Sequence, residues 1–370
     1  MNDPRAVGLA ADAADVAARV AATIRPEIRS MSAYAVAKAD GIVKLDAMEN
    51  PYTLPESVRM RIAEALADVA INRYPDGAAE GVKRALRTSL GLAGDVGLIV
   101  GNGSDELLAL ITTAVARPGA VVLAPEPSFV YYRLDAVYSN ARFVGVPLQE
   151  DFSLDLGAML AAIERERPAL VWLAYPNNPT GNLFDAAAVE AIARASPGLV
   201  VIDEAYYAFA SHTFLPRVLE FANLAVVRTV SKIGMAGLRL GYAVAHPAWI
   251  AELEKVRPPY NINAYTQAAL PILLGESEVL DTQAAAIRAE RSRVGTALAR
   301  LPGVSVHRTE TNFVLARVPD APRWFAALRV AGILVKNLHG WHPLLAHRLR
   351  ITVGTPAEND ALLRVLEKTA

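Results

Sequence analysis

The sequence predicts an α/β protein whose large domain is built on a mostly parallel sheet of about seven strands flanked by helices. Between about residues 97 and 245, short runs rich in Val, Ile and Leu alternate with longer helical patterns. Runs that are apolar at successive positions are typical of strands buried on both faces, with helices between them as cover. Three of the runs lead directly into polar clusters, and ligands bind such sheets at the carboxyl ends of the strands. The expected strands are residues 97–100, 120–124, 141–146, 169–174, 199–202, 224–230 and 240–245.

A smaller α+β domain is expected from the two ends of the chain. After residue 265, helical patterns rich in Ala, Arg and Glu alternate with short apolar runs. We therefore expect residues 49–264 to form the large domain, and residues 1–48 together with 265–370 to form the small one. The helical patterns lie at residues 284–301, 323–331 and 358–367, and the strand-like runs at 313–315 and 350–353.

Composition excludes several classes of function. The chain has 370 residues, 53% of them hydrophobic, and its 37 Lys and Arg nearly balance 38 Asp and Glu. A net charge of −1 gives no general attraction to nucleic acid or anionic lipid. Without cysteine, neither disulfides nor a thiolate zinc site can form, and no metal site is expected. The N-terminus lacks the pattern of a secretory signal, and the longest apolar run, residues 107–116, is too short to cross a bilayer, so we expect a soluble cytoplasmic protein.

Lys232 is the strongest candidate for a catalytic residue. It follows a buried apolar run, and desolvation there lowers the pKa of a lysine and leaves its amine nucleophilic. A lysine that forms a Schiff base with pyridoxal phosphate needs an acidic partner for the pyridinium nitrogen and donors for the phenolic oxygen. Asp203, Tyr206 and Asn178 follow two other apolar runs and supply these residue types. Each residue also has a plainer interpretation: a surface lysine, a helix-capping aspartate, a core tyrosine or a turn asparagine.

The string Pro-Asn-Asn-Pro-Thr-Gly at residues 176–181 extends this set. Taken alone it predicts a turn, because Asn, Pro and Gly favour turns. Asn-Pro-Thr-Gly after a buried strand, together with Asp203 and Lys232, resembles the fold-type I aminotransferases, which depend on pyridoxal phosphate. The resemblance implies that fold, with Lys232 as the covalent cofactor anchor and as the general base and acid. It also implies that Asn178, Asp203 and Tyr206 contact the cofactor ring.

Candidate phosphate ligands lie in two places. Ser231 and Arg239 fit phosphate binding, because a guanidinium offers a fork of donors. The spacing of seven from Lys232 to Arg239 is one residue shorter than in many related enzymes. Ser104 and Asp105 open a helical pattern, where free backbone amides bind a phosphate or are simply capped. The resemblance implies the phosphate role for this loop.

Two aromatic residues complete the expected cofactor site. Phe129 stands where the family carries an aromatic that stacks on the pyridine ring, with a core phenylalanine as the plainer interpretation. Tyr74, in Asn-Arg-Tyr-Pro, matches a family tyrosine that reaches across a dimer interface to the partner's phosphate. The resemblance therefore implies a homodimer with shared active sites.

Short strings along almost the whole chain resemble the histidinol-phosphate aminotransferases of histidine biosynthesis. They include Met-Glu-Asn-Pro at 48–51, Thr-Asn-Phe-Val-Leu at 311–315 and Arg-Ile-Thr-Val-Gly at 350–354. The family transfers an amino group between L-histidinol phosphate with 2-oxoglutarate and imidazole-acetol phosphate with L-glutamate. The resemblance thus implies a subsite that accepts either a phosphate ester or a dicarboxylate.

The expected substrate-binding residues are Tyr34, Asn178, Arg350 and Lys336. A guanidinium such as that of Arg350 pairs bidentately with carboxylate or phosphate, and Tyr34 is either a phosphate contact or a packing residue. The chain departs from the family at two positions. Lys336 stands where relatives often place a second arginine, and Met48 replaces a common asparagine. Both departures bear on substrate preference and leave the chemistry at Lys232 untouched.

Three other functions stay open from the sequence. An aromatic amino acid aminotransferase would share the same catalytic set. A pyridoxal-phosphate decarboxylase of a phosphorylated amino acid would release carbon dioxide and need no oxo acid. A non-enzymatic regulator would normally carry an N-terminal DNA-binding module, and the roughly 40 residues before Gly41 are too few and insufficiently basic for one.

Overall fold

The computed structural model describes residues 12–33 and 40–370, and the chain divides between residues 38 and 39 into two compact units. The first unit contains helices α1 (Ala13–Thr23) and α2 (Pro26–Arg29). Neither helix has a buried residue among those described. All the other elements belong to the second unit.

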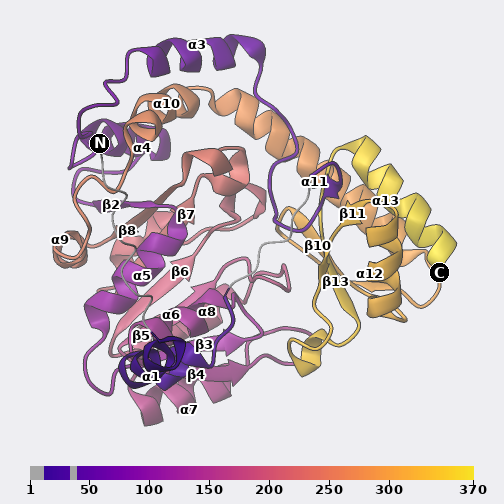
Figure 1. The fold of residues 1–370 in the computed structure, drawn as a ribbon, viewed down its shortest axis with the longest axis horizontal. Coiled ribbons are helices and arrows are strands. Elements are labelled where there is room, and N and C mark those ends of the chain that lie inside the picture. Colours follow the sequence, from indigo (N-terminus) through magenta and orange to yellow (C-terminus); the bar gives the residue numbers. More distant parts are fainter. Residues whose placement is uncertain (1–11, 34–39) are drawn as a thin grey trace, which may run out of the picture. The chain divides into compact units, whose positions relative to one another are not determined.

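The main sheet of the second unit has seven strands in the order β2-β8-β7-β6-β5-β3-β4 (Figure 1). Strand β8 runs antiparallel to both of its neighbours, and every other pair is parallel. The central strands are buried at every position, as their continuous apolar runs predict. The predicted α/β fold with a mostly parallel sheet is therefore confirmed. The strands are β2 (Gly97–Asn102), β3 (Val121–Glu126), β4 (Arg142–Pro147), β5 (Leu170–Ala174), β6 (Leu199–Asp203), β7 (Leu224–Thr229) and β8 (Leu240–Ala245).

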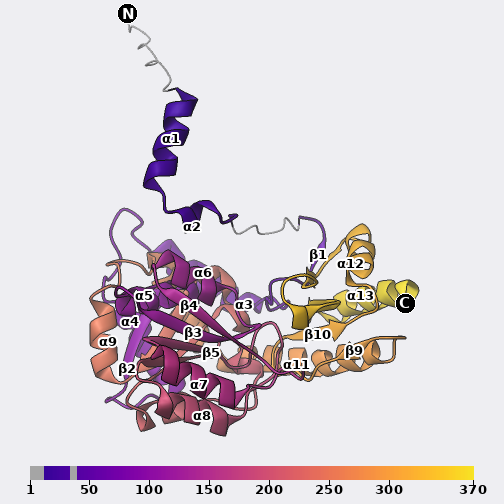
Figure 2. The same cartoon turned by 90° about the horizontal axis from the view of Figure 1, so that it is seen from below.

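Helices cover both faces of this sheet. In Figure 2, α5 and α6 lie on one side of the strands, and α7 and α8 lie on the other. The side chains alternate accordingly: Val201 and Val227 belong to the core under α5 and α6, whereas Val200 and Val226 belong to the core under α7 and α8. The covering helices are α5 (Ser104–Val115), α6 (Tyr131–Tyr138), α7 (Leu156–Glu166), α8 (Ala186–Ala195) and α9 (Pro247–Glu254).

A second, antiparallel sheet has the order β12-β13-β10-β9 and packs against α11, α12 and α13 (Figure 1). Strand β1 pairs in parallel with β11, which attaches residues 43–44 to this region. The domain boundaries expected at residues 48 and 264 stay a prediction. The elements are β1 (Val43–Lys44), α11 (Ser277–Ala299), β9 (Ser305–Val306), β10 (Phe313–Arg317), α12 (Ala321–Val330), β11 (Ile333–Leu334), β12 (Lys336–Asn337), β13 (Arg348–Thr352) and α13 (Pro356–Thr369).

Helix α10 packs against α3 and α4, and short 3₁₀ turns connect several strands. Within residues 12–33 and 40–370, no helix is long and apolar enough to cross a membrane. The same residues contain no group of three or more His, Asp or Glu side chains that could hold a metal ion. The remaining elements are α3 (Glu56–Ala67), α4 (Glu80–Leu90), α10 (Ala264–Leu274), η1 (Tyr207–Phe209), η2 (Leu215–Glu220), η3 (Ser231–Ile233), η4 (Ala236–Leu238) and η5 (Pro343–Leu345).

Gly198 is expected to be essential for close pairing of β5 and β6. A Cβ atom at this position would lie 2.3 Å from the carbonyl oxygen of Ala169, so Gly198→Ala must push two strands apart. We expect a loss of about 1–3 kcal/mol, measured as a lower apparent melting temperature. Gly94→Ala is the control, because a Cβ atom there meets nothing within 4 Å. Equal melting temperatures for the two variants would contradict the prediction.

Candidate active site

Asp203 ends β6 and is almost fully buried. Its Oδ2 accepts a hydrogen bond from the hydroxyl of Tyr132 at 2.7 Å, and its Oδ1 accepts from the backbone N–H of Ala205 at 3.1 Å. Burial raises the pKa of the Asp203 carboxyl to about 6, and the bond from Tyr132 opposes that rise. Both of these donors are neutral, so the carboxylate can still pair with a protonated ring nitrogen.

Lys232 lies in η3, one turn beyond β7. Its Nζ donates to the carbonyl oxygen of Ala47 at 3.0 Å. Desolvation lowers the pKa of the Lys232 ammonium to about 8, and the nearby charge of Arg350 lowers it further. Near neutral pH the amine can therefore exist in both forms, which a nucleophile and proton carrier requires.

Arg350 and Asn178 connect the two sheets at the site. The Arg350 Nη1 donates to Asn178 Oδ1 at 2.6 Å, and its Nη2 donates to the carbonyl oxygen of Asp46 at 2.9 Å. Lys336 lies directly opposite Arg350 on the antiparallel partner strand. Desolvation and the charge of Arg350 lower the pKa of Lys336, whose Nζ lies 4.7 Å from the ring centre of Trp341. Two cations in register are the natural partners of an anion.

Three of the phosphate candidates, Arg239, Ser104 and Asp105, lie at the start of α5. The guanidinium of Arg239 lies against Gly103, because a Cβ atom on Gly103 would be 2.6 Å from Arg239 Nη2. Gly103 is the N-cap of α5 and makes no side-chain cap, so Ser104 and Asp105 begin a helix whose amides are available. Ser231 lies close by in sequence to Lys232 and is buried, with its Oγ 2.9 Å from Thr229 Oγ1.

Tyr206 and Phe129, the two aromatic residues expected beside the cofactor ring, differ in burial and in their neighbours. Tyr206 is buried, and its ring meets Phe313 edge-on at 5.4 Å between centroids. Phe129 is partly buried and meets the ring of Tyr132 edge-on at 5.6 Å. Because Tyr132 bonds Asp203, Phe129 lies in the neighbourhood of that carboxylate. Its stacking role stays a prediction.

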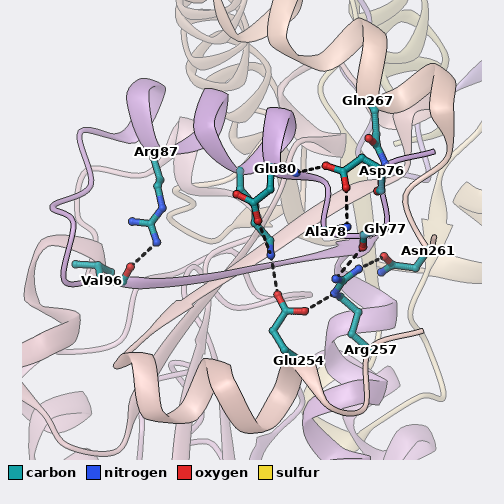
Figure 3. Close-up of polar contacts among 11 residues, drawn as sticks. Asp76, Gly77, Ala78, Glu80, Arg87, Val96, Glu254, Arg257, Asn261 and Gln267 are labelled. Atoms are coloured by element: carbon teal, nitrogen blue, oxygen red, sulfur yellow. Dashed lines mark hydrogen bonds and ion pairs between the residues drawn. The ribbon is translucent and has the colours of Figure 1, made fainter. Parts of the chain in front are cut away.

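Tyr74 lies on an exposed loop before α4. Its side chain is 82% exposed, and its ring stacks on Tyr260 at 4.6 Å between centroids. Figure 3 shows how the next residues are held: Arg257 Nη2 donates to the carbonyl oxygen of Gly77 at 3.0 Å. The loop thus has a defined position, and the tyrosine side chain is largely exposed.

The structure adds two groups that the sequence motifs missed. Tyr132 is the donor to Asp203, and its ring stacks on Trp172 at 5.1 Å. The carbonyl oxygen of Ala47 is the acceptor for Lys232. Tyr132 lies three residues beyond Phe129 and carries no motif, and a backbone carbonyl has no sequence signal at all. Tyr34 lies outside the described residues.

Comparison with known proteins identifies the class of protein. The family model "Aminotransferase class I and II" matches residues 40–366, and the chain belongs to this family. A "Histidinol-phosphate aminotransferase" of Chromobacterium violaceum is 55% identical over 345 residues, which cover 93% of this chain and 97% of the relative. "Histidinol-phosphate aminotransferase 1" of Ralstonia nicotianae is 52% identical, with 92% of each chain covered.

A solved structure agrees with these relatives. The histidinol-phosphate aminotransferase of Sinorhizobium meliloti, solved in complex with pyridoxal-5'-phosphate, superposes with a TM-score of 0.84 at 28% identity. The match covers 94% of this chain and 97% of the other. The fold-type I transferase fold and the histidinol-phosphate aminotransferase resemblance are therefore confirmed. The roles of individual side chains stay predictions.

Asp203→Asn is expected to stabilise the cofactor-free protein at high pH. Because the pKa of Asp203 is higher in the folded state, folding binds a proton, and that contribution to stability is lost as the pH rises from about 4 through about 6. At pH 8 the variant should therefore gain up to about 3 kcal/mol in the free energy of unfolding. Urea unfolding at pH 4 and pH 8 tests this; the same gain at both values would contradict it.

Proposed function

We propose that this chain catalyses the reversible transamination of L-histidinol phosphate and 2-oxoglutarate to imidazole-acetol phosphate and L-glutamate, in L-histidine biosynthesis, with pyridoxal phosphate as cofactor. The single observation that carries the proposal is the convergence of a buried carboxylate, a desolvated lysine and two cations in register. Relatives with the name histidinol-phosphate aminotransferase match over nine-tenths of the chain. A chain without cysteine is compatible with our further proposal that the enzyme acts in the cytoplasm.

The residues present fit pyridoxal phosphate. Asp203 offers an anion of raised pKa to the ring nitrogen, and Lys232 offers an amine of lowered pKa. The start of α5 beside Arg239 offers amides and a guanidinium to a phosphate. We assign Ser104, Asp105, Phe129, Asn178, Tyr206 and Ser231 to cofactor binding on the same basis.

Lys232 is proposed as the covalent anchor and as the group that moves the proton. Bound pyridoxal phosphate supplies the electron sink for the pair left at the substrate Cα. Once the substrate amine takes its place, Lys232 Nζ would be free to accept the substrate Cα proton and to give a proton back. Its pKa of about 8 suits both directions near neutral pH. Asp203 keeps the ring nitrogen protonated, because a buried carboxylate favours a cation beside it.

Arg350 and Lys336 are proposed to bind the distal anion of each substrate. Like charges placed directly opposite across two strands repel, so an anion between them removes a cost that the free protein carries. A phosphate ester and the second carboxylate of glutamate satisfy the same requirement. Asn178 holds Arg350 through Nη1 and thereby fixes the guanidinium plane. Tyr34, which lies outside the described residues, stays a candidate for the same anion.

The reaction is tested by single half-reactions of the cofactor-loaded protein. We expect histidinol phosphate or glutamate alone to remove the absorbance band of the bound cofactor, and histidinol phosphate to act at the lower concentration. Loss of this band with phenylalanine, without any response to histidinol phosphate, would instead indicate an aromatic aminotransferase. Carbon dioxide release from a phosphorylated amino acid would indicate a decarboxylase.

The proposed role of Lys232 as the covalent anchor of the cofactor is tested by Lys232→Ala, with Lys255→Ala as control. Lys255 is an exposed lysine paired with Glu252, so its loss should leave activity within about twofold. Lys232→Ala should abolish turnover, and borohydride should no longer fix the cofactor covalently to the chain. Normal turnover by Lys232→Ala would refute the assignment.

We also propose a homodimer in which Tyr74 contacts the cofactor phosphate of the partner. Tyr74, Tyr260, Tyr265 and Ile71 are large, exposed side chains on this face, as expected of a surface that another chain covers. If each site takes Lys232 from one chain and Tyr74 from the other, both chains are needed for one site.

Mixed dimers test this arrangement. Lys232→Ala chains mixed and refolded with Tyr74→Ala chains should regain activity that neither has alone, because one site per hybrid has both residues. Lys232→Ala mixed with Asp203→Ala is the control, since those two residues belong to the same chain's site and no recovery is expected. Equal recovery in both mixtures, or in neither, would contradict the shared site.

A further inference from the structure

A buried ion pair lies directly behind the proposed site and lines no part of it. Glu204 and Arg228 expose 0% and 6% of their side chains, and Arg228 Nη2 lies 2.8 Å from Glu204 Oε2. A second bond runs from Arg228 Nε to the same oxygen at 2.9 Å. Glu204 follows Asp203 directly, and Arg228 lies four residues before Lys232. Both charges therefore lie within four residues of one of the two central residues of the proposed chemistry.

The pair lies on the opposite face of the sheet from Asp203. Along β6, Val201 shares a core with Tyr132, the donor to Asp203, and side chains alternate, so Asp203 faces that side. Glu204 and Arg228 face the other side, where Phe214 and Tyr242 lie. The ion pair thus connects the ends of β6 and β7 on the face of the sheet opposite Asp203.

Glu204 also closes the loop that carries Tyr206. Its Oε1 accepts from the backbone N–H of Phe214, at 2.6 Å, and the hydroxyl of Thr213 lies 2.9 and 2.8 Å from its two carboxylate oxygens. Arg228 Nη2 donates to the same hydroxyl at 2.8 Å. Both ends of residues 204–214 are therefore fixed to one carboxylate, and Tyr206 lies between them.

Arg228 is also held in place by its neighbours. The Arg228 guanidinium lies over the ring of Tyr207 at 4.1 Å from its centre, and Tyr207 is the neighbour of Tyr206. On the strand side, Arg228 is followed by Thr229, which bonds Ser231. Arg228 thus touches the sequence neighbour of Tyr206, and Glu204 is itself the sequence neighbour of Asp203.

Stability alone does not explain such a pair. Removing two charges from water costs several kcal/mol per ion, and apolar replacements of buried pairs are often neutral or stabilising. A fully hydrogen-bonded pair fixes the geometry of the segments it joins, which apolar contacts do less sharply.

We infer that Glu204 and Arg228 are positioning residues, which hold Asp203, Tyr206 and Lys232 in register for cofactor binding and proton transfer. This inference rests on the proposed function, because it needs those three residues to act on pyridoxal phosphate. The pair is expected to act on cofactor affinity and on kcat, and to leave substrate binding largely unchanged.

The test replaces both charges by apolar groups, in Glu204→Met/Arg228→Met. The melting temperature of the cofactor-free chain should be unchanged or higher, because a desolvation cost is removed. The dissociation constant for pyridoxal phosphate should rise about tenfold and kcat should fall at least about tenfold, since small displacements of reacting groups are costly. KM for histidinol phosphate should stay within about threefold.

Glu290→Met/Arg293→Met is the control, at a more exposed ion pair. It removes an ion pair of α11 that contacts no proposed site residue, and it should leave cofactor affinity and kcat unchanged. If the double variant of the inferred pair does not fold, Glu204→Gln replaces it, with cofactor affinity expected to fall in the same direction. Wild-type cofactor affinity and kcat in a folded variant would overturn the inference. Borohydride fixation to Lys232 in the unaltered chain is judged separately, so failure of the proposed function would be recognised on its own.

Discussion

The site depends on one constraint of the fold: β5, β6 and β7 are parallel neighbours, so their carboxyl ends meet at one edge of the sheet. The register aligns Ala174 with Asp203 and Asp203 with Val227, which puts the ends of the three strands side by side. Asp203 is the last residue of β6, and Asn178 and Lys232 follow the ends of β5 and β7 at a short distance along the chain. Residues from three separate segments are thereby brought to one edge without any loop having to span the distance.

The same edge carries an electrostatic cost. Burial raises the pKa of Asp203 and lowers that of Lys232, so in both residues the charged form is disfavoured. Arg350 and Lys336 add a second cost, because two cations lie opposite each other across β13 and β12. In the proposed assignment, a cofactor with a cationic ring nitrogen and a substrate with a distal anion would each offset one of these costs. Ligand binding is therefore favoured by charges that are unfavourable in the free protein.

The sequence predicted the sheet and the residues nearest its edge well, since continuous apolar runs followed by polar residues are a local signal. In the structure Asp203 ends a strand, and Lys232 and Asn178 follow strands within a few residues. Tyr132 could not be found this way, because its bond to Asp203 joins positions 71 residues apart. Nor could the Ala47 carbonyl, which meets Lys232 across 185 residues.

Met48 departs from the family pattern, in which asparagine is common at this position. Its φ of 54° is left-handed, a conformation that asparagine adopts more readily than methionine. The turn is retained here by long-range bonds: Met48 N–H donates to Thr352, and Asn312 donates to the Met48 carbonyl.

These bonds show how the two sheets cooperate at the site. Met48 is tied to β13 and its neighbourhood, and the adjacent Ala47 carbonyl accepts from Lys232 on the main sheet. Arg350 of β13 reaches the main sheet through Asn178 and the chain before residue 49 through Asp46. Arg350 and Lys232, the residues proposed to bind the distal anion and to move the proton, are therefore positioned by one connected set of contacts. A change that shifts residues 46–48 would consequently move acceptors of both Arg350 and Lys232, even where it leaves the main sheet intact.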